Sequence, residues 1–304
     1  MKKISIGGTC IGWFNSDFAT QIDENRKLEL GVSRHEPIYT NTLNKNLSLR
    51  RELIINFDSY GNGRPRGWTS ERAFRDTIRE GLKEIYEVSR IYGITPSQVR
   101  KLVTITYDNE ADDIYTPEQY GTFAKILIEE VNGKFDIGLG NFNGLRENYY
   151  TFICENVSGF KYLDVHLQRE FETTSLVDKN FPRLKSIADK YGKVLRVTEA
   201  FPVGIDLWTD KGYDLLMYQL TKSIEYNAKA FCCFIRFDRT GDYRKLAFLR
   251  GSEIHKKWEE FKSIIEFYRP VIDLEEDMRL ENYYYKDRPQ HLIKKDPMGY
   301  GIIF

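Results

Sequence analysis

The sequence has no apolar run that approaches the roughly 20 residues of a membrane-spanning helix. Its first ten residues, MKKISIGGTC, carry two lysines but no apolar stretch of signal-peptide length. It has only four cysteines, and none of them lies in a CxxC or Cys/His spacing typical of zinc. We therefore expect no metal and no other cofactor, and a cytoplasmic location. Export without a cleaved signal remains the alternative.

The chain also has no surplus of charge of either sign. Lys and Arg total 45, and Asp and Glu total 45, so the formal net charge is zero. Nucleic acids and anionic membranes attract basic proteins, and we therefore expect neither as a partner. Aromatic residues, in contrast, are abundant, with 20 Tyr, 19 Phe and 4 Trp. They indicate either a bulky core or a surface that stacks on flat ligand faces.

Short apolar segments alternate with segments of helical composition along most of the chain. Segments with strand composition, rich in β-branched and aromatic residues, are 4–8, 32–39, 53–58, 102–108, 134–140, 160–168, 194–199 and 230–237. Segments with helical composition or periodicity are 21–30, 71–90, 117–131, 145–156, 176–191, 211–226 and 252–268.

Eight strand–helix units over residues 1–270 match the number and size of a (β/α)8 TIM barrel. We therefore predict an α/β protein in which 1–270 form a single barrel domain. An open doubly wound sheet is the alternative, but Gly7-Gly8 lacks the GxGxxG spacing of its phosphate loop. Residues 271–304 are charged and rich in tyrosine without periodicity. We expect them to form a C-terminal tail, packed on the barrel or on a partner subunit in an oligomer.

Polar residues occur at the ends of most of the predicted strands. In strand order they are Arg34 and His35, Asp58, Asn109 and Glu110, His166, Glu199, and Arg236 or Asp238. The carboxyl ends of parallel barrel strands meet at one rim, where barrel enzymes keep their active sites. The fourth and seventh strands lie opposite one another, so Glu110 and Glu199 are expected to face each other across a bound ligand.

This pattern resembles the large clan of (β/α)8 retaining glycoside hydrolases, in which strand four ends in Asn-Glu and strand seven in Glu. The resemblance implies hydrolysis of O-glycosidic bonds in an oligo- or polysaccharide. It implies that Glu110 is the general acid/base and Glu199 the nucleophile. It also implies that Asn109 binds a sugar 2-hydroxyl and that Arg34 keeps the nucleophile ionised.

Other residues near the predicted rim are candidates for substrate binding. They are His35, His166 and Asp58 at strand ends, and Trp13, Trp68 and Trp208 in the loops that follow strands. A tryptophan ring can stack on the C–H face of a sugar, although a role in the core is equally open for each. Desolvation by Tyr107 and negative charge on Asp108 and Asp112 would favour the protonated acid that Glu110 must be.

Two further functions fit the same residues. Glu110, His166, Glu199 and Asp238 offer oxygen and imidazole ligands for Mn²⁺ or a similar ion, as in a metal-dependent sugar isomerase or epimerase. A barrel that only binds glycans, or is part of an assembly, is the other alternative, because a fold does not decide function.

Overall fold

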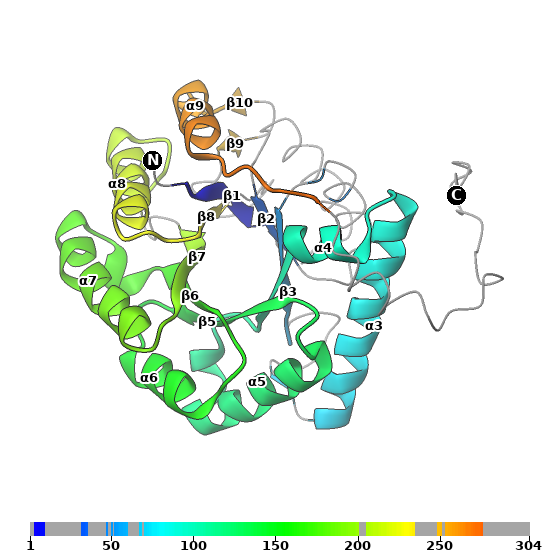
Figure 1. The fold of residues 1–304 in the computed structure, drawn as a ribbon. Coiled ribbons are helices and arrows are strands. Elements are labelled where there is room, and N and C mark those ends of the chain that lie inside the picture. The colour runs from blue at the N-terminus through cyan, green and yellow to red at the C-terminus, as the bar shows by residue number, and fades with distance from the viewer. Residues whose placement is uncertain are drawn as a thin grey trace.

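The computed structural model describes residues 3–9, 32–35, 47, 50, 52–59, 67–68, 70–200, 205–234, 248–250 and 253–275. Eight parallel strands form a closed barrel in sequence order, with β1 hydrogen-bonded to both β2 and β8. Helices form an outer ring around the strands (Figure 1). The predicted (β/α)8 barrel is confirmed.

The strands are β1 Ser5–Thr9, β2 Val32–His35, β3 Glu52–Phe57, β4 Val103–Tyr107, β5 Asp136–Asn143, β6 Tyr162–Leu167, β7 Val194–Ala200 and β8 Ala230–Phe234. The helices are α3 Glu71–Ile91, α4 Pro96–Leu102, α5 Pro117–Val131, α6 Glu147–Asn156, α7 Thr174–Lys190, α8 Asp210–Glu225 and α9 Trp258–Tyr268. Two 3₁₀ turns, η1 Ala111–Asp113 and η2 Arg169–Phe171, and a small antiparallel pair, β9 Leu249–Arg250 and β10 Glu253–Ile254, complete the described elements.

One helix of the structure is absent from the predictions, one predicted helix is shorter in the structure, and one falls outside the described residues. Helix α4 was missed, although Thr95 and Gln98 form a capping box around a proline at the first position. The helix expected over 252–268 begins only at Trp258, because β10 and a turn anchored by His255 precede it. The helix expected over 21–30 lies outside the described residues.

The buried apolar side chains of the described residues form two clusters. The larger joins the outer faces of the strands to the inward faces of the helices. Phe74 of α3, for example, packs on Tyr107 of β4 with ring centroids 5.3 Å apart. The smaller cluster is Ile54, Ala230 and Cys232 on β3 and β8, and we place it inside the barrel.

The segment after α9 crosses one end of the barrel toward α4 (Figure 1, orange). The side chain of Gln98 donates to the Leu274 carbonyl over 3.0 Å, and Lys101 donates to the Glu275 carbonyl over 2.7 Å. Ile272 and Leu274 are partly buried against the core. The first residues of the predicted tail thus lie on the barrel, and 276–304 lie outside the described residues. None of the described helices is long and apolar enough to cross a membrane.

A buried ion pair occupies the barrel interior. Arg196 of β7 binds Asp164 of β6 through two hydrogen bonds of 2.7 Å, and at most 1% of either residue is exposed. Thr106 donates to the same carboxylate over 2.6 Å, and the guanidinium lies 4.4 Å from the Tyr162 ring centroid. Gly138 makes room for the pair, since a Cβ there would lie 2.1 Å from an Arg196 nitrogen. Charge-assisted hydrogen bonds therefore hold this part of the interior together.

The ion pair predicts a non-additive pair of substitutions. Asp164→Leu should lower the free energy of unfolding by about 3–5 kcal/mol, because it leaves the Arg196 charge buried without its partner. The double variant Asp164→Leu/Arg196→Met should recover most of that loss. Urea unfolding followed by circular dichroism measures both values. A double variant as unstable as the sum of its single variants would show that the two side chains do not act as a pair.

Candidate active site

Glu110 lies three residues beyond the end of β4, in a turn of left-handed backbone. Its φ is 49° and its ψ is 43°, and it caps the 3₁₀ turn η1. Its backbone N–H donates to the carbonyl of Asn141 on β5 over 2.9 Å. Left-handed backbone is disfavoured for a residue with a Cβ, so the contact with β5 compensates for local strain. The turn directs Glu110 toward the centre of the rim.

Glu199 reaches the same place because β7 is irregular. The register between β6 and β7 shifts after Val165–Val197, so that His166 is opposite Glu199 and Thr198 is the extra residue. Side chains alternate in a regular strand, and Thr198 and Glu199 would then face opposite sides. With the shift, Thr198 hydrogen-bonds inside the barrel at 2.6 Å from Asn141 while Glu199 lies at the rim.

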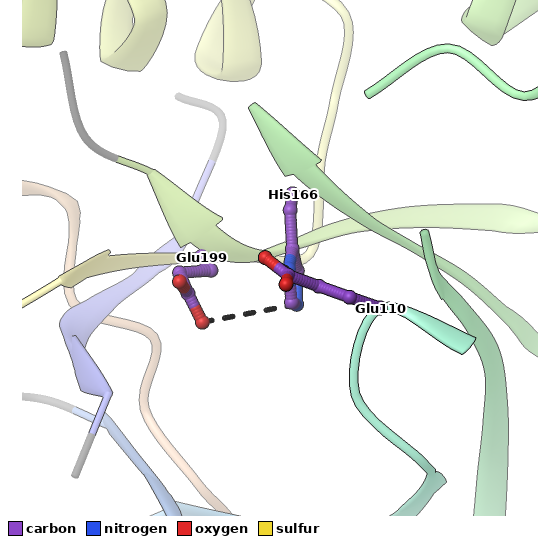
Figure 2. A group of neighbouring side chains, drawn as sticks. All are labelled: Glu110, His166 and Glu199. Atoms are coloured by element: carbon purple, nitrogen blue, oxygen red, sulfur yellow. Dashed lines mark ion pairs between the residues drawn. The ribbon is translucent and has the colours of Figure 1, made fainter. Parts of the chain in front are cut away.

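The two carboxylates meet over a fully buried histidine (Figure 2). His166 Nδ1 lies 3.6 Å from a Glu110 oxygen, and Nε2 lies 3.9 Å from a Glu199 oxygen. Neither ring nitrogen has a hydrogen-bond partner among the described residues, and the ring is 0% exposed. One oxygen of Glu110 and one of Glu199 lie within 4.8 Å of each other. The predicted facing of the two glutamates is therefore present in the structure.

Gln168, which directly follows β6, joins the two carboxylates. Its Nε2 lies 3.0 Å from Glu110 Oε1 and 3.4 Å from Glu199 Oε1, so one amide group donates to both. Sequence reasoning missed this residue, because the predicted sixth strand was taken to end near His166 and Gln168 was not considered as a site residue. The pattern His-x-Gln at a strand end, which puts two residues on one face, was the available signal.

Asn141 lies beneath the two glutamates and is hydrogen-bonded to the strands that carry them. Its side-chain amide donates to the Asp108 carbonyl over 2.8 Å and to Thr106 Oγ1 over 2.9 Å. Its Oδ1 accepts the Thr198 hydroxyl hydrogen bond of 2.6 Å. Asn141 is 0% exposed and is the extra residue at a second register shift, between β5 and β6. It thereby connects the strand end that carries Glu110 with the strand that carries Glu199.

The other predicted site residues fall into two groups. Asn109 and Asp58 are half-buried at the ends of β4 and β3, next to Asp108. The backbones of Arg34 and His35 lie in β2, paired with Ile54 and Ile55, but their side chains are outside the described part of the structure. Trp13, Arg236 and Asp238 also lie outside it.

Three expectations for aromatic residues are refined by the structure. Trp68 is only 8% exposed and packs on Phe74 at 4.8 Å, so it belongs to the core and offers no open face. Tyr107 faces the helices rather than Glu110, as its contacts with Phe74 and Tyr120 show. Trp208 is half-buried, with its ring 5.1 Å from the His255 ring, and part of it remains accessible.

Asp108 and Asp112, whose negative charge was expected to favour protonated Glu110, have partners of their own. Asp112 accepts hydrogen bonds from Arg146 Nε at 2.7 Å and from the Asn143 N–H at 3.0 Å, so its charge is balanced. Asp108 is fully buried, and burial raises the pKa of its carboxyl. Hydrogen bonds with Asp58, the Asn109 N–H and Ser59 act in the opposite direction on that pKa.

Asp108 also anchors Ser59, the second residue after β3. Ser59 Oγ lies 3.1 Å from Asp108 Oδ1 and accepts the Gly67 N–H over 3.0 Å, while the Trp68 N–H donates to the Tyr115 hydroxyl. Burial and the Asp108 charge together raise the pKa of Tyr115 to about 12, although the Trp68 contact lowers it. Ser59 and Gly67 are therefore both tied to groups around Asp108.

Glu110, His166 and Glu199 are also residues of the types that bind metal ions. Each offers one ligand atom, and these atoms lie within 4.8 Å of one another. Zinc ligands at about 2.0–2.2 Å from the ion lie closer together than this, so a metal would require the three side chains to move inward. The Gln168 amide also donates to both carboxylates, and its N–H groups would oppose a cation there.

No protein-family model matches the chain, and no curated protein sequence is similar to it. Solved structures share its fold. An endo-1,4-β-D-mannanase from Thermotoga petrophila has 11% identity, covers 88% of this chain and 100% of its own, and gives a TM-score of 0.56. A β-mannanase from Thermomonospora fusca in complex with mannohexaose has 13% identity, 88% and 89% coverage, and a TM-score of 0.59.

A GH39 β-xylosidase from Caulobacter crescentus is a third structure of this kind. It has 11% identity, covers 87% of this chain and 72% of its own, and gives a TM-score of 0.64. The resemblance to the barrels of glycoside hydrolases is thus confirmed at the level of the fold. At such low sequence identity, these matches show only that the fold is shared.

The Asp108 pKa predicts a pH dependence of stability. A carboxyl whose pKa is raised by folding stabilises the protein below its unfolded pKa of about 4, and that stabilisation is lost as the pH rises through the folded value. The free energy of unfolding of the wild type should therefore fall, relative to that of Asp108→Asn, as the pH rises from 4 toward 7. Chemical unfolding of both proteins over this range measures the difference.

Asp210→Asn is the control for this experiment. Lys256 lowers the pKa of the exposed Asp210, so any effect of that group appears as the pH falls below about 4. Its stability difference from wild type should stay constant between pH 4 and 7. A constant difference for Asp108→Asn as well would show that folding does not raise the Asp108 pKa.

Proposed function

We propose that the protein is a glycoside hydrolase that cleaves O-glycosidic bonds with retention of anomeric configuration. The observation that supports it most is the approach of Glu110 and Glu199, which have oxygens within 4.8 Å of each other. Retaining enzymes place their two carboxyl groups about 5–5.5 Å apart, whereas inverting enzymes leave about 6.5–9.5 Å for a water molecule. The fold shared with mannanases and a xylosidase agrees with a carbohydrate substrate.

The surroundings of the two glutamates support different roles for them. The Glu110 side chain is 21% exposed, and a general acid/base must exchange its proton with solvent in each turnover. The Glu199 side chain is 4% exposed, which suits a nucleophile that forms a covalent intermediate shielded from water. Glu110 is therefore the acid/base and Glu199 the nucleophile, as the resemblance implied.

The reaction has two steps. Glu199 attacks the anomeric carbon while the Glu110 carboxyl protonates the glycosidic oxygen, which breaks the bond and leaves a glycosyl ester on Glu199. Glu110, now ionised, then removes a proton from water, and the resulting attack on the anomeric carbon releases Glu199 and the sugar. Two inversions give net retention.

Substrate contacts come from residues beside the two glutamates. Asn109, half-buried directly before Glu110, binds the sugar 2-hydroxyl. Trp208, half-buried after β7, offers an aromatic surface to a neighbouring sugar ring. Arg34, His35, Asp58 and Trp13 remain candidates for further contacts. His166 lies under the carboxylates and is fully buried, so it offers no exposed surface to a substrate.

The proposal predicts different results for the two glutamates. Glu199→Gln should reduce turnover of aryl glycosides by several orders of magnitude, because no covalent intermediate can form. Glu110→Ala should lower turnover about 10²–10⁴-fold for glycosides with poor leaving groups, and much less for glycosides with good leaving groups. Azide should restore the rate of Glu110→Ala and yield a glycosyl azide. Proton NMR of the first product formed by wild type identifies its anomer.

Four outcomes would count against the proposal. Equal losses in both variants without azide rescue would reject the assigned roles, and an inverted first product would reject retention. Loss of activity on exhaustive chelation, restored by Mn²⁺, would favour the metal-dependent isomerase or epimerase. Binding of glycans by wild type without hydrolysis across a broad panel would favour a non-catalytic barrel.

A further inference from the structure

Three side chains connect the protein surface with both glutamates. Arg169, with 46% of its side chain exposed, lies against the Asn143 amide. With that amide assigned so that its oxygen faces the guanidinium, Arg169 donates to Asn143 Oδ1 from Nη2 over 2.9 Å and from Nε over 3.2 Å. Asn143 Nδ2 in turn donates to Gln168 Oε1 over 2.8 Å. Gln168 Nε2 then donates to Glu110 at 3.0 Å and to Glu199 at 3.4 Å. We refer to Arg169, Asn143 and Gln168 as the amide relay.

The direction of every hydrogen bond in the amide relay follows from its outer end. A guanidinium group can only donate hydrogen bonds, so Asn143 must turn its oxygen to Arg169 and its nitrogen to Gln168. Gln168 must then accept with Oε1 and point its nitrogen at the carboxylates. If both amides were reversed, a donor would face the guanidinium and an oxygen would face the two glutamates.

The orientation of Gln168 matters because of where it lies. It is 5% exposed, and Asn143 is 7% exposed, so water cannot readily replace a lost partner. A reversed Gln168 would place its oxygen against two carboxylates, and a buried acceptor that faces no donor is destabilising. In its observed orientation the amide offers one N–H to each glutamate, which holds both at a fixed separation.

We propose that Arg169 and Asn143 are positioning residues, which act through Gln168 to hold Glu110 and Glu199 at their catalytic separation. This inference rests on the proposed function for its kinetic effect. The orientation of the Gln168 amide itself does not depend on it.

A purely structural role for Arg169 and Asn143 and a positioning role predict opposite results for Asn143→Asp. If the two residues only stabilised the fold, a folded Asn143→Asp variant would keep its activity. Asn143→Asp keeps an acceptor for Arg169, and a charged acceptor makes that hydrogen bond stronger. It removes the donor to Gln168, however, so Gln168 must turn its nitrogen to the new carboxylate and its oxygen to the glutamates. The relay therefore predicts a protein that stays folded but loses activity.

The chain offers a matched control on the neighbouring helix. Arg183 of α7 is 48% exposed and also donates to an asparagine, Asn180 Oδ1, over 3.1 Å. Asn180 then donates to the Glu170 carbonyl rather than toward the glutamates. Arg183→Met thus removes an equivalent surface guanidinium without altering the amide relay.

The first experiment compares kcat and KM of four variants on an aryl glycoside. Asn143→Asp should lower kcat by about 100-fold, the order expected when reacting groups shift by about 1 Å, with KM nearly unchanged. Arg169→Met should lower kcat by about tenfold. The Asn143 amide can then reverse, but no charge forces it to do so. Arg169→Lys should retain most of the wild-type kcat, since an ammonium group also only donates. Arg183→Met should match wild type.

The second experiment reports on the amide without any turnover. In protein labelled with ¹⁵N-glutamine, the Gln168 side-chain amide signal is identified by its loss in Gln168→Leu. In otherwise wild-type protein, the substitution Glu110→Gln should shift the Gln168 amide signal. In protein that also carries Asn143→Asp, Glu110→Gln should leave that signal unshifted.

The two measurements separate the failure of the relay from the failure of the proposed function. Wild-type kcat in Asn143→Asp, or an amide signal that still responds to Glu110→Gln in that background, would overturn the relay. If wild type hydrolyses no glycoside, the proposed function fails and the amide signal alone decides the relay.

Discussion

The polar interior of the barrel constrains the rest of this structure. Arg196 and Asp164 are almost fully buried, so each of their hydrogen-bonding groups must find a partner inside the barrel. Beyond the ion pair itself, the partners include short hydroxyl side chains from neighbouring strands, such as Thr106. Thr106 accepts a hydrogen bond from Asn141, and Asn141 binds the backbone of the active-site turn at Asp108 and at Glu110. The position of Glu110 therefore depends on hydrogen bonds that continue down to the ion pair.

The approach of Glu110 and Glu199 depends on places where the strands are irregular. Regular alternation would send Thr198 and Glu199 to opposite faces, and the register shift of β7 allows Thr198 to bond inside the barrel while Glu199 lies at its rim. On β5, Asn141 adopts a φ of 51° at a similar shift. A positive φ is costly for a residue with a Cβ, and it persists where the surrounding contacts determine it. Both irregularities lie directly beneath the two glutamates.

The site combines a rigid base with an accessible top. His166 and Gln168 lie under the carboxylates and are at most 5% exposed, while Glu110 retains contact with solvent. The proposed retaining mechanism needs both properties, since its nucleophile must be fixed and its acid/base must exchange protons. The amide relay extends the fixed part to the surface through donors and acceptors whose directions are set by Arg169.

The sequence by itself determined the barrel and the placement of its two glutamates. Strand composition, helical periodicity and their alternation are local properties, and counting the units was enough to place Glu110 and Glu199 on the fourth and seventh strands. The capping box at Thr95 was also readable, although it was overlooked. The tertiary structure alone decided the burial of Trp68, the outward direction of Tyr107 and the contacts of Gln168. A register shift is a relation between two strands, and the direction of an amide depends on partners far away in sequence, so neither can be derived from a local pattern.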